Sequence, residues 1–179
     1  MLQWLGKEPE IMSFEYKLTL NDIEKRTLLE WGDDIFASEQ FNLIWRPKDL
    51  HLVMYQQDMP VSKCGLLRQT IRVGSHDLEV AGIGGVVTAP ECQNQGFATQ
   101  LIDEALRFVE TEWLLSVSAL FCRNELVPFY QQLGWKGAER EVMIVQPHGS
   151  VRAPMNFLVY EVAPGSWPGG AVELGCLPW

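Results

Sequence analysis

The sequence predicts a mixed α/β domain in which helices flank a central, twisted and mostly antiparallel sheet. Residues 50–57, 61–73 and 78–88 are extended apolar stretches separated by turn signals, which indicates an antiparallel meander. A helical stripe of apolar residues then begins at Phe97, and a buried strand is expected over residues 113–121. A strand, a helix and a strand in this order place two strands of one sheet parallel to each other.

Two shorter helices complete the predicted helical part. Residues 21–31 are expected to form a helix, with Asn21 as its N-cap. Residues 124–133 are expected to form a second one. Gly134 should end it, because glycine readily adopts the left-handed conformation that often follows a helix.

The last third of the chain adds two strands and an irregular segment. The strands are expected at residues 141–145 and 156–162. Glycine and proline are frequent over residues 164–179, so this segment should run irregularly over the surface or along a cleft. A length of 179 residues fits one domain, and residues 1–179 are therefore predicted to fold as a single unit.

The composition is that of a globular protein, and its charge limits the partners. Hydrophobic residues make up 47% of the chain, and 14 basic against 23 acidic residues give a formal net charge of −9. Nucleic acids and anionic membranes bind cationic faces, so neither is expected as a partner. An acidic protein would concentrate cationic amines, although acidic surfaces also serve solubility alone.

The cysteines and the chain start bear on metal binding and location. The four cysteines form no CxxC pair and no zinc-site spacing, so no metal site is expected. The N-terminal residues do not resemble a signal peptide, and no apolar run approaches the ~20 residues that span a bilayer. The expected location is the cytoplasm, where thiols stay reduced.

The turn between the third predicted strand and the long helix is the most informative segment. The strand ends at residues 86–88, and residues 93–98 (QNQGFA) lead into the helix. Free N–H groups at a helix start, together with the positive end of the helix dipole, form an anion site. Gly96 would let the backbone approach a phosphate closely, and the small Ala98 would keep side-chain bulk away.

This segment resembles a known family. Residues 93–98 match the Gln/Arg-x-x-Gly-x-Gly/Ala signature of the GNAT superfamily of acyl-CoA-dependent N-acyltransferases. Residues 124–135 (NELVPFYQQLGW) resemble the second signature of that family, an Asn followed by Phe-Tyr and then by Leu-Gly-aromatic. The two signatures are separated by a helix and a strand, as in the superfamily, and the resemblance covers residues 80–136.

The resemblance implies an activity and a co-substrate. A GNAT enzyme transfers an acetyl group from acetyl-CoA to a primary amine by direct attack within a ternary complex. A small cationic amine is the expected acceptor here. The alternatives are a protein lysine or N-terminus as acceptor, and an acyl-CoA-binding module without catalysis. A homodimer is also possible.

The resemblance also assigns roles to residues. The N–H groups near Val87 and Thr88 are the candidate oxyanion donors, and Tyr130 is the candidate general acid, with packing against CoA as its alternative role. Asn124 is expected to bind the cofactor, with a helix N-cap as its alternative role. The expected cofactor-binding residues are Val86, Val87, Thr88, Gln93, Asn94, Gln95, Gly96, Phe97, Ala98, Thr99 and Asn124.

The general base is less well defined. Many GNAT enzymes carry a glutamate on the strand before the phosphate turn, where this chain has Gly82 and Gly84. Glu79 lies on the same strand and is the candidate base, provided that a bulge in the glycine-rich stretch turns it toward the site. His51 and His76 are further alternatives.

The end of the chain supplies one more candidate. The run over residues 122–130 and the aromatic C-terminus faintly resemble aminoglycoside 2'-N-acetyltransferases, from which the glycines on the strand depart. A polyamine or an amino sugar would then be a reasonable acceptor. The chain ends in Leu-Pro-Trp, and a tryptophan can anchor such a tail. We expect the α-carboxylate of Trp179 to lie in the acceptor site and to bind or deprotonate the amine.

Overall fold

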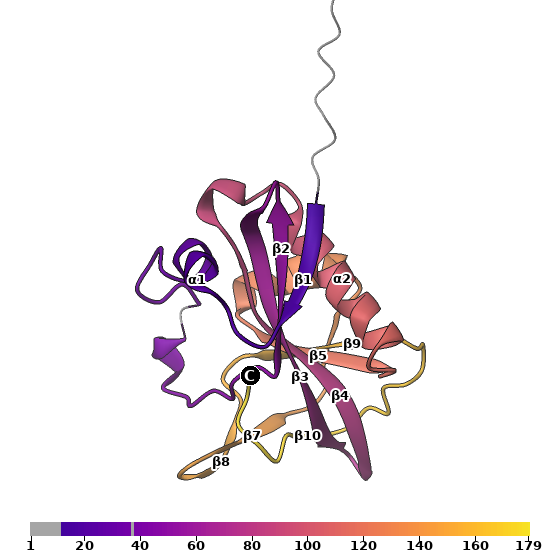
Figure 1. Cartoon of the computed structure of the whole chain (residues 1–179). Helices are drawn as coiled ribbons and strands as arrows, with labels where there is room; N and C mark the ends of the chain where they lie inside the picture. Colours follow the sequence, from indigo (N-terminus) through magenta and orange to yellow (C-terminus); the bar gives the residue numbers. More distant parts are fainter. Residues whose placement is uncertain (1–11, 37) are drawn as a thin grey trace, which may run out of the picture.

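The computed structural model describes residues 12–36 and 38–179. Within these residues the strands form a single ten-stranded mixed sheet with helices packed against it (Figure 1). This arrangement confirms the predicted mixed α/β fold class.

The elements have the following bounds. The helices are α1 (Asp22–Leu28), α2 (Phe97–Thr111) and α3 (Val127–Gln132), and the 3₁₀ turns are η1 (Glu39–Phe41), η2 (Pro90–Cys92) and η3 (Asn124–Leu126). The strands are β1 (Met12–Lys17), β2 (Leu50–Gln56), β3 (Met59–Val73), β4 (His76–Thr88), β5 (Val117–Cys122), β6 (Lys136–Gly137), β7 (Val142–Gln146), β8 (Gly149–Arg152), β9 (Asn156–Glu161) and β10 (Val172–Glu173).

The long strands β3 and β4 organise the sheet. The strand order is β6-β9-β5-β4-β3-β10-β7-β8, and β2 pairs with β3 and with β1. Strands β2, β3 and β4 are antiparallel neighbours, as the predicted meander requires. Strands β4 and β5 are parallel and are joined through α2, which confirms the predicted strand–helix–strand unit.

Strand β4 is irregular near its carboxyl end. Gly65 of β3 pairs with Gly84, but Lys63 pairs with Val87, so β4 contains one extra residue between these two pairs. The backbone of Gly85 has a φ of +58°, which glycine adopts without strain. The extra residue is a β-bulge, and it bends the strand where the parallel pairing with β5 ends.

Helices α1 and α2 cover opposite faces of β2, as Figure 1 shows. Leu52 and Met54 are buried in the cluster that α2 contributes to, whereas Val53 and Tyr55 are buried in the cluster beneath α1. Successive side chains of a strand point to opposite faces, so this alternation is what places the two helices.

The C-terminal segment belongs to the core. Its short strand β10 lies between β3 and β7, and it pairs in parallel with β7. The Trp179 ring is buried and lies 5.4 Å from the Phe121 ring and 6.2 Å from the Phe157 ring, measured between centroids. The segment predicted to be irregular therefore returns across the sheet and packs against it.

The predicted cap of α1 is present and is tied to the sheet. The Asn21 side chain accepts a hydrogen bond from the Glu24 N–H, and the Glu24 carboxylate accepts one from the Asn21 N–H. The buried Glu24 carboxylate also accepts hydrogen bonds from the Lys17 ammonium and the Tyr55 hydroxyl. Burial raises the pKa of Glu24, but the bonds from Lys17 and Tyr55 outweigh it and hold that pKa below its ordinary value.

We expect Glu24→Gln to lower the free energy of unfolding by about 1–3 kcal/mol at pH 7, because Lys17 loses a buried anion. Since the native pKa of Glu24 is lowered, this contribution is present above the unfolded value of about 4.3 and is lost as the pH falls below it. Urea denaturation at pH 7 and at pH 3 measures both effects. Glu30→Gln, at an exposed position just beyond the same helix, is the control. Equal stability of Glu24→Gln and the wild type at pH 7 would contradict this account.

Candidate functional site

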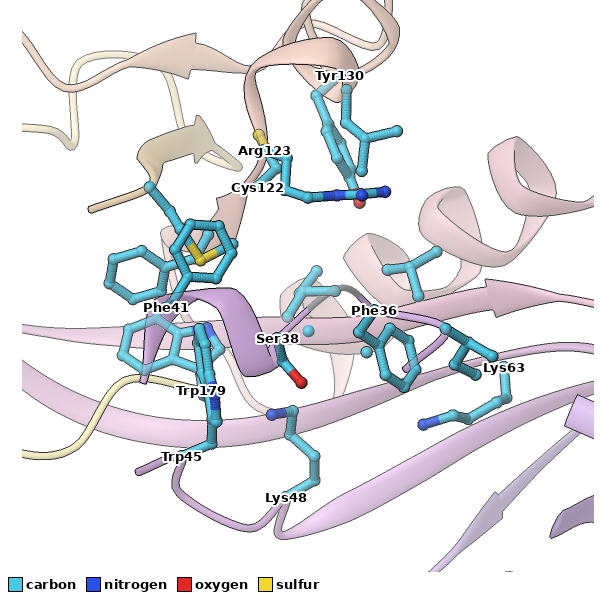
Figure 2. A pocket seen from close by; sticks show the side chains of 18 residues that line it. Phe36, Ser38, Phe41, Trp45, Lys48, Lys63, Cys122, Arg123, Tyr130 and Trp179 are labelled. Carbon is cyan, nitrogen blue, oxygen red and sulfur yellow. The ribbon is translucent and has the colours of Figure 1, made fainter. Parts of the chain in front are cut away.

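A cavity of about 390 Å³ opens where β4 and β5 separate. The two strands pair only from Ala81 to Ile83 on the β4 side, and β5 then continues alongside β9. Figure 2 shows the cavity with side chains from the β5 end, from α3, from the segment before β2 and from the end of the chain.

The free edge of β4 forms one wall of this cavity. Its lining residues on β4 are Ile83, which makes the last pair with β5, and Gly84, Gly85 and Val86, which lie at the bulge and beyond that pair. In the part of the chain that the structure describes, no strand pairs with that edge of β4 after Ile83. Unpaired main-chain groups of this kind can hydrogen-bond an extended ligand in place of a further strand.

The predicted phosphate turn lies just past the end of β4. Gly96 has a φ of +83° and precedes α2, whose start has no side-chain cap and no acidic residue in its first turn. The Gln93 side chain donates to the Thr88 carbonyl at 3.2 Å, and the Gln95 side chain donates to the Glu91 carbonyl at 3.0 Å. The side chains thus hold the turn, while the first amides of the helix stay available to an anion.

The environment of this turn is open. Residues 93–96 are exposed, and a Cβ added at Gly96 would meet no atom within 4 Å. Phe97 is buried in the core, whereas Ala98 and Thr99 are partly exposed. A ligand can therefore reach the backbone of this turn, including Asn94, from solvent.

Two of the predicted strand residues lie away from the cavity. Val87 is buried in the cluster beneath α1, and its carbonyl accepts a hydrogen bond from the Ser62 hydroxyl at 2.8 Å. The Thr88 hydroxyl lies 2.9 Å from the same Ser62 oxygen. Neither residue lines the cavity, because the bulge moves the lining to Gly84, Gly85 and Val86.

Tyr130 lies in α3 and lines the cavity, as the second signature predicts. Its ring packs at 5.1 Å from Phe129 and 6.0 Å from Trp135, and its hydroxyl end points into the cavity (Figure 2). Burial raises the pKa of Tyr130 above its ordinary value, with smaller contributions from Cys122 and Cys64. The phenol therefore stays protonated at neutral pH and is able to donate a hydrogen bond.

Glu79 and Asn124 lie elsewhere. Glu79 is exposed on β4 opposite Thr70 and does not line the cavity. The bulge that was expected to turn it inward lies at Gly85, and the pairing between the two positions is regular. Asn124 begins η3, accepts a hydrogen bond from the Asn156 side chain at 2.8 Å, and lines a neighbouring hollow instead. The alternative bases His51 and His76 do not line the cavity either.

Trp179 explains the two glycines where many GNAT enzymes carry a glutamate. A Cβ at Gly82 would lie 2.5 Å from Cε2 of Trp179, and one at Gly84 would lie 3.3 Å from its main-chain carbonyl carbon. The Trp179 indole is buried and lines the cavity. A glutamate at either position would need the space that Trp179 fills.

Two lysines that the sequence analysis did not single out lie in the wall of the cavity. Lys48 precedes β2, and Lys63 lies on β3 with its ammonium 5.8 Å from the centre of the Phe36 ring. Burial, followed by the charges of Lys63 and Arg46, lowers the pKa of Lys48 to about 8. Burial lowers the pKa of Lys63 as well.

A sequence signal existed for one of these lysines. Lys63 stands inside a stretch that otherwise reads as a buried strand, and a charged residue at such a position indicates a functional role. Lys48 lies in an irregular segment that has no periodic pattern, so no comparable signal was available.

The described residues contain no group of three or more His, Cys, Asp or Glu side chains that is able to hold a metal ion. A membrane-spanning helix is likewise absent from them, since no helix in this part of the chain has the necessary length and apolar character.

Comparison with known proteins places this cavity in a family. The family model described as Acetyltransferase (GNAT) domain matches residues 30–138, which include β4, the turn, α2 and α3. No curated protein matches the sequence.

Solved structures share the fold. Escherichia coli YhbS, a GNAT family N-acetyltransferase in complex with CoA, has a TM-score of 0.63 and 15% identity, over 94% of this chain and 92% of that one. An acyl-CoA N-acyltransferase from Pseudomonas aeruginosa has a TM-score of 0.54 and 21% identity, over 83% and 99%. A GCN5-related N-acetyltransferase from Kribbella flavida is 26% identical with a TM-score of 0.43, and the match spans 49% of this chain but only 22% of that one.

These comparisons do not show the fainter resemblance to aminoglycoside 2'-N-acetyltransferases, which stays a prediction. The family model covers more than half of the sequence. The matched residues include the free edge of β4, the predicted phosphate turn and Tyr130. The chain belongs to the GNAT acetyltransferase family.

Proposed function

We propose that the protein is an N-acetyltransferase that moves an acetyl group from acetyl-CoA to the primary amine of a small molecule. The observation that carries the proposal is the cavity between β4 and β5, where Tyr130 faces an unpaired strand edge that ends in an anion-binding turn. Such a site is able to hold an extended thioester along the strand and its phosphates at the helix start.

The cofactor would lie along β4. Its pyrophosphate would accept hydrogen bonds from the amides of residues 95–99, and its pantetheine arm would follow the strand edge at residues 84–86. The CoA bound by YhbS, which shares the fold, supports this assignment. Asn124 lines the neighbouring hollow together with Asn156 and does not line the cavity itself. It would therefore contact the cofactor only if part of the cofactor entered that hollow.

The acetyl transfer would use main-chain N–H groups of β4 and the Tyr130 hydroxyl. The neutral amine attacks the thioester carbonyl, and the N–H groups at Gly85 and Val86 would stabilise the oxyanion. The C–S bond then breaks, and the protonated Tyr130 would donate to the departing thiolate, whose conjugate acid has a pKa of about 8.5. The proton that the attacking nitrogen releases would pass to solvent and restore the Tyr130 phenol, so the transfer balances.

The size and lining of the cavity support a small acceptor over a protein chain. A volume of about 390 Å³ suits a ligand of a few carbon atoms beside the thioester. The large side chains Phe41, Trp45 and Trp179 line it and would contact such a molecule.

We further propose that residues 1–179 form one domain, in line with their length. The C-terminal segment supplies β10 and a wall of the cavity, so it belongs to the same unit as the signatures over residues 80–136.

We expect Gly96→Glu to weaken CoA binding at least tenfold, which is about 1.4 kcal/mol, because it places a carboxylate where the pyrophosphate would bind. Isothermal titration with CoA measures the effect. Gly165→Glu is the matched control, because Gly165 has a φ of +80°, against +83° for Gly96, and also has open space around its Cβ position. Unchanged CoA affinity in a folded Gly96→Glu protein would remove the phosphate assignment.

We expect Tyr130→Phe to lower kcat by about 10- to 100-fold, as for the loss of a general acid, while CoA affinity stays within about twofold. The rate of thiol release with a good acceptor measures kcat. Tyr160→Phe is the control, because its ring packs against Trp135 at 5.6 Å but does not line the cavity. If both variants turn over at the wild-type rate, Tyr130 serves packing alone.

A further inference from the structure

The side chains that line the cavity carry more positive than negative charge. Its charged lining residues are Lys48, Lys63 and Arg123, and no acidic side chain of the described residues lines it. Arg123 forms an ion pair with Glu125 at 3.1 Å, whereas no acidic side chain in the described ranges pairs with either lysine. Buried ammonium groups cost free energy unless an anion accompanies them, so this lining points to an anionic ligand.

The fold makes a specific place for Lys48. Its side chain lies across Gly65 and Gly84, which are paired between β3 and β4. A Cβ at Gly65 would overlap the Lys48 side chain, and a Cβ at Gly84 would lie 3.1 Å from Cε and 3.3 Å from Nζ. A slot of two facing glycines thus fixes the path of this lysine and delivers its ammonium to the cavity.

Lys63 is directed to the same region by the bulge. Its side chain is 5% exposed, and its Nζ lies 3.3 Å from the position that a Cβ at Gly85 would take. Figure 2 shows Lys48 and Lys63 on one side of the cavity, with Tyr130 and Arg123 on the other. The two ammonium groups therefore face the space across from the group that would act on the thioester.

The phosphates of CoA do not account for these lysines. In the proposed binding mode the phosphates lie at the start of α2, and none of residues 93–99 lines the cavity. The thioester end of acetyl-CoA carries no charge. An anion on the acceptor is then one candidate partner of the lysines. The expected α-carboxylate of Trp179 is the other, because its carbon and the Lys48 ammonium both lie 3.3 Å from the position of a Cβ at Gly84. Only the first predicts a preference for an anionic acceptor.

We propose that the acceptor is an amine that also carries a carboxylate, a molecule of the amino acid class, and that Lys48 and Lys63 bind this carboxylate. The inference rests on the proposed function, and it differs from the cationic acceptor that the sequence led us to expect. Phe36, Phe41 and Trp45 would contact the apolar body of such a molecule, since they form much of the remaining lining.

The protonation of Lys48 supports the proposal. The charged and titratable groups around it are Lys63, Arg46, Cys64, Asp49 and His51, and burial together with the charges of Lys63 and Arg46 lowers its pKa to about 8. A bound carboxylate favours the charged ammonium and raises that pKa. Binding of the acceptor above pH 8 should therefore take up protons, and its affinity should fall as the pH rises through about 8.

The first experiment compares three forms of one acceptor in the wild-type enzyme, namely phenylalanine, phenylalaninamide and 2-phenylethylamine, and repeats the comparison for the other amino acids. We expect kcat/KM for the best amino acid to exceed that of its amide by about 10- to 100-fold, because only the acid forms charge-assisted bonds with both lysines. Phosphoethanolamine, an amine that carries a phosphate in place of a carboxylate, tests whether the lysines prefer a phosphate. A preference for the amide, for a polyamine or for the phosphate would overturn the proposal.

The second experiment uses variants. Lys48→Met and Lys63→Met should each reduce the ratio of kcat/KM between the acid and its amide at least about fivefold, while exposed Lys25→Met leaves it unchanged. The ratio compares two substrates in the same variant, so a general loss of stability does not mimic the effect. Retention of the wild-type ratio in both cavity variants would overturn the assignment.

A binding measurement separates this inference from the proposed function. Trp45 and Trp179 line the cavity, so their fluorescence should report titration with an N-acetylamino acid and with its amide in the wild-type protein. Tighter binding of the acid is expected, and equal binding would overturn the carboxylate site. If polyamines are acetylated best, the proposed function stands and the inference fails. If acetyl-CoA binds but no amine is acetylated, the proposed function fails, and this titration still decides the carboxylate site.

Discussion

The separation of β4 from β5 is the constraint on which the rest of the structure depends. The strands share three residue pairs, and the bulge at Gly85 then bends β4 away while β5 stays with β9. Full pairing would satisfy the β4 edge and close the cavity. Because the pairing stops, the same strand offers free main-chain groups, leads into the turn at Gly96 and faces Tyr130 of α3.

The glycines of β4 near the cavity have no side chains, so side chains from other segments fill the space beside them. Gly82 and Gly84 leave room for Trp179, and Gly65 and Gly84 leave room for Lys48. Both of these residues come from irregular parts of the chain. In the proposed binding mode, tertiary packing would therefore set the groups that face the acceptor, whereas local backbone geometry would set the cofactor side.

The difference between features set by local backbone geometry and features set by tertiary packing explains which parts the sequence was able to predict. The meander, the parallel unit and the turn at Gly96 follow from local patterns, and the structure has all three. The short strands β6, β8 and β10 escaped prediction, because two to four residues give no periodicity and only their neighbours make them strands. The glycine-rich stretch suggested that a bulge was possible, but it did not give the position of the bulge at Gly85. The cavity is therefore lined by the residues just before Val87 and Thr88 and not by these two.

The net charge of the whole chain and the charges that line the cavity favour different acceptors. A net charge of −9 suggested a cationic acceptor, yet the cavity is lined by Lys48, Lys63 and Arg123. Exposed charges are screened over about 8–10 Å in physiological salt, whereas buried groups are screened much less. The acidic exterior therefore acts mainly on how fast a charged molecule approaches, and the desolvated lysines act on which molecule stays bound. Under the proposal of an anionic acceptor, the local charges of the cavity would outweigh the net charge of the chain.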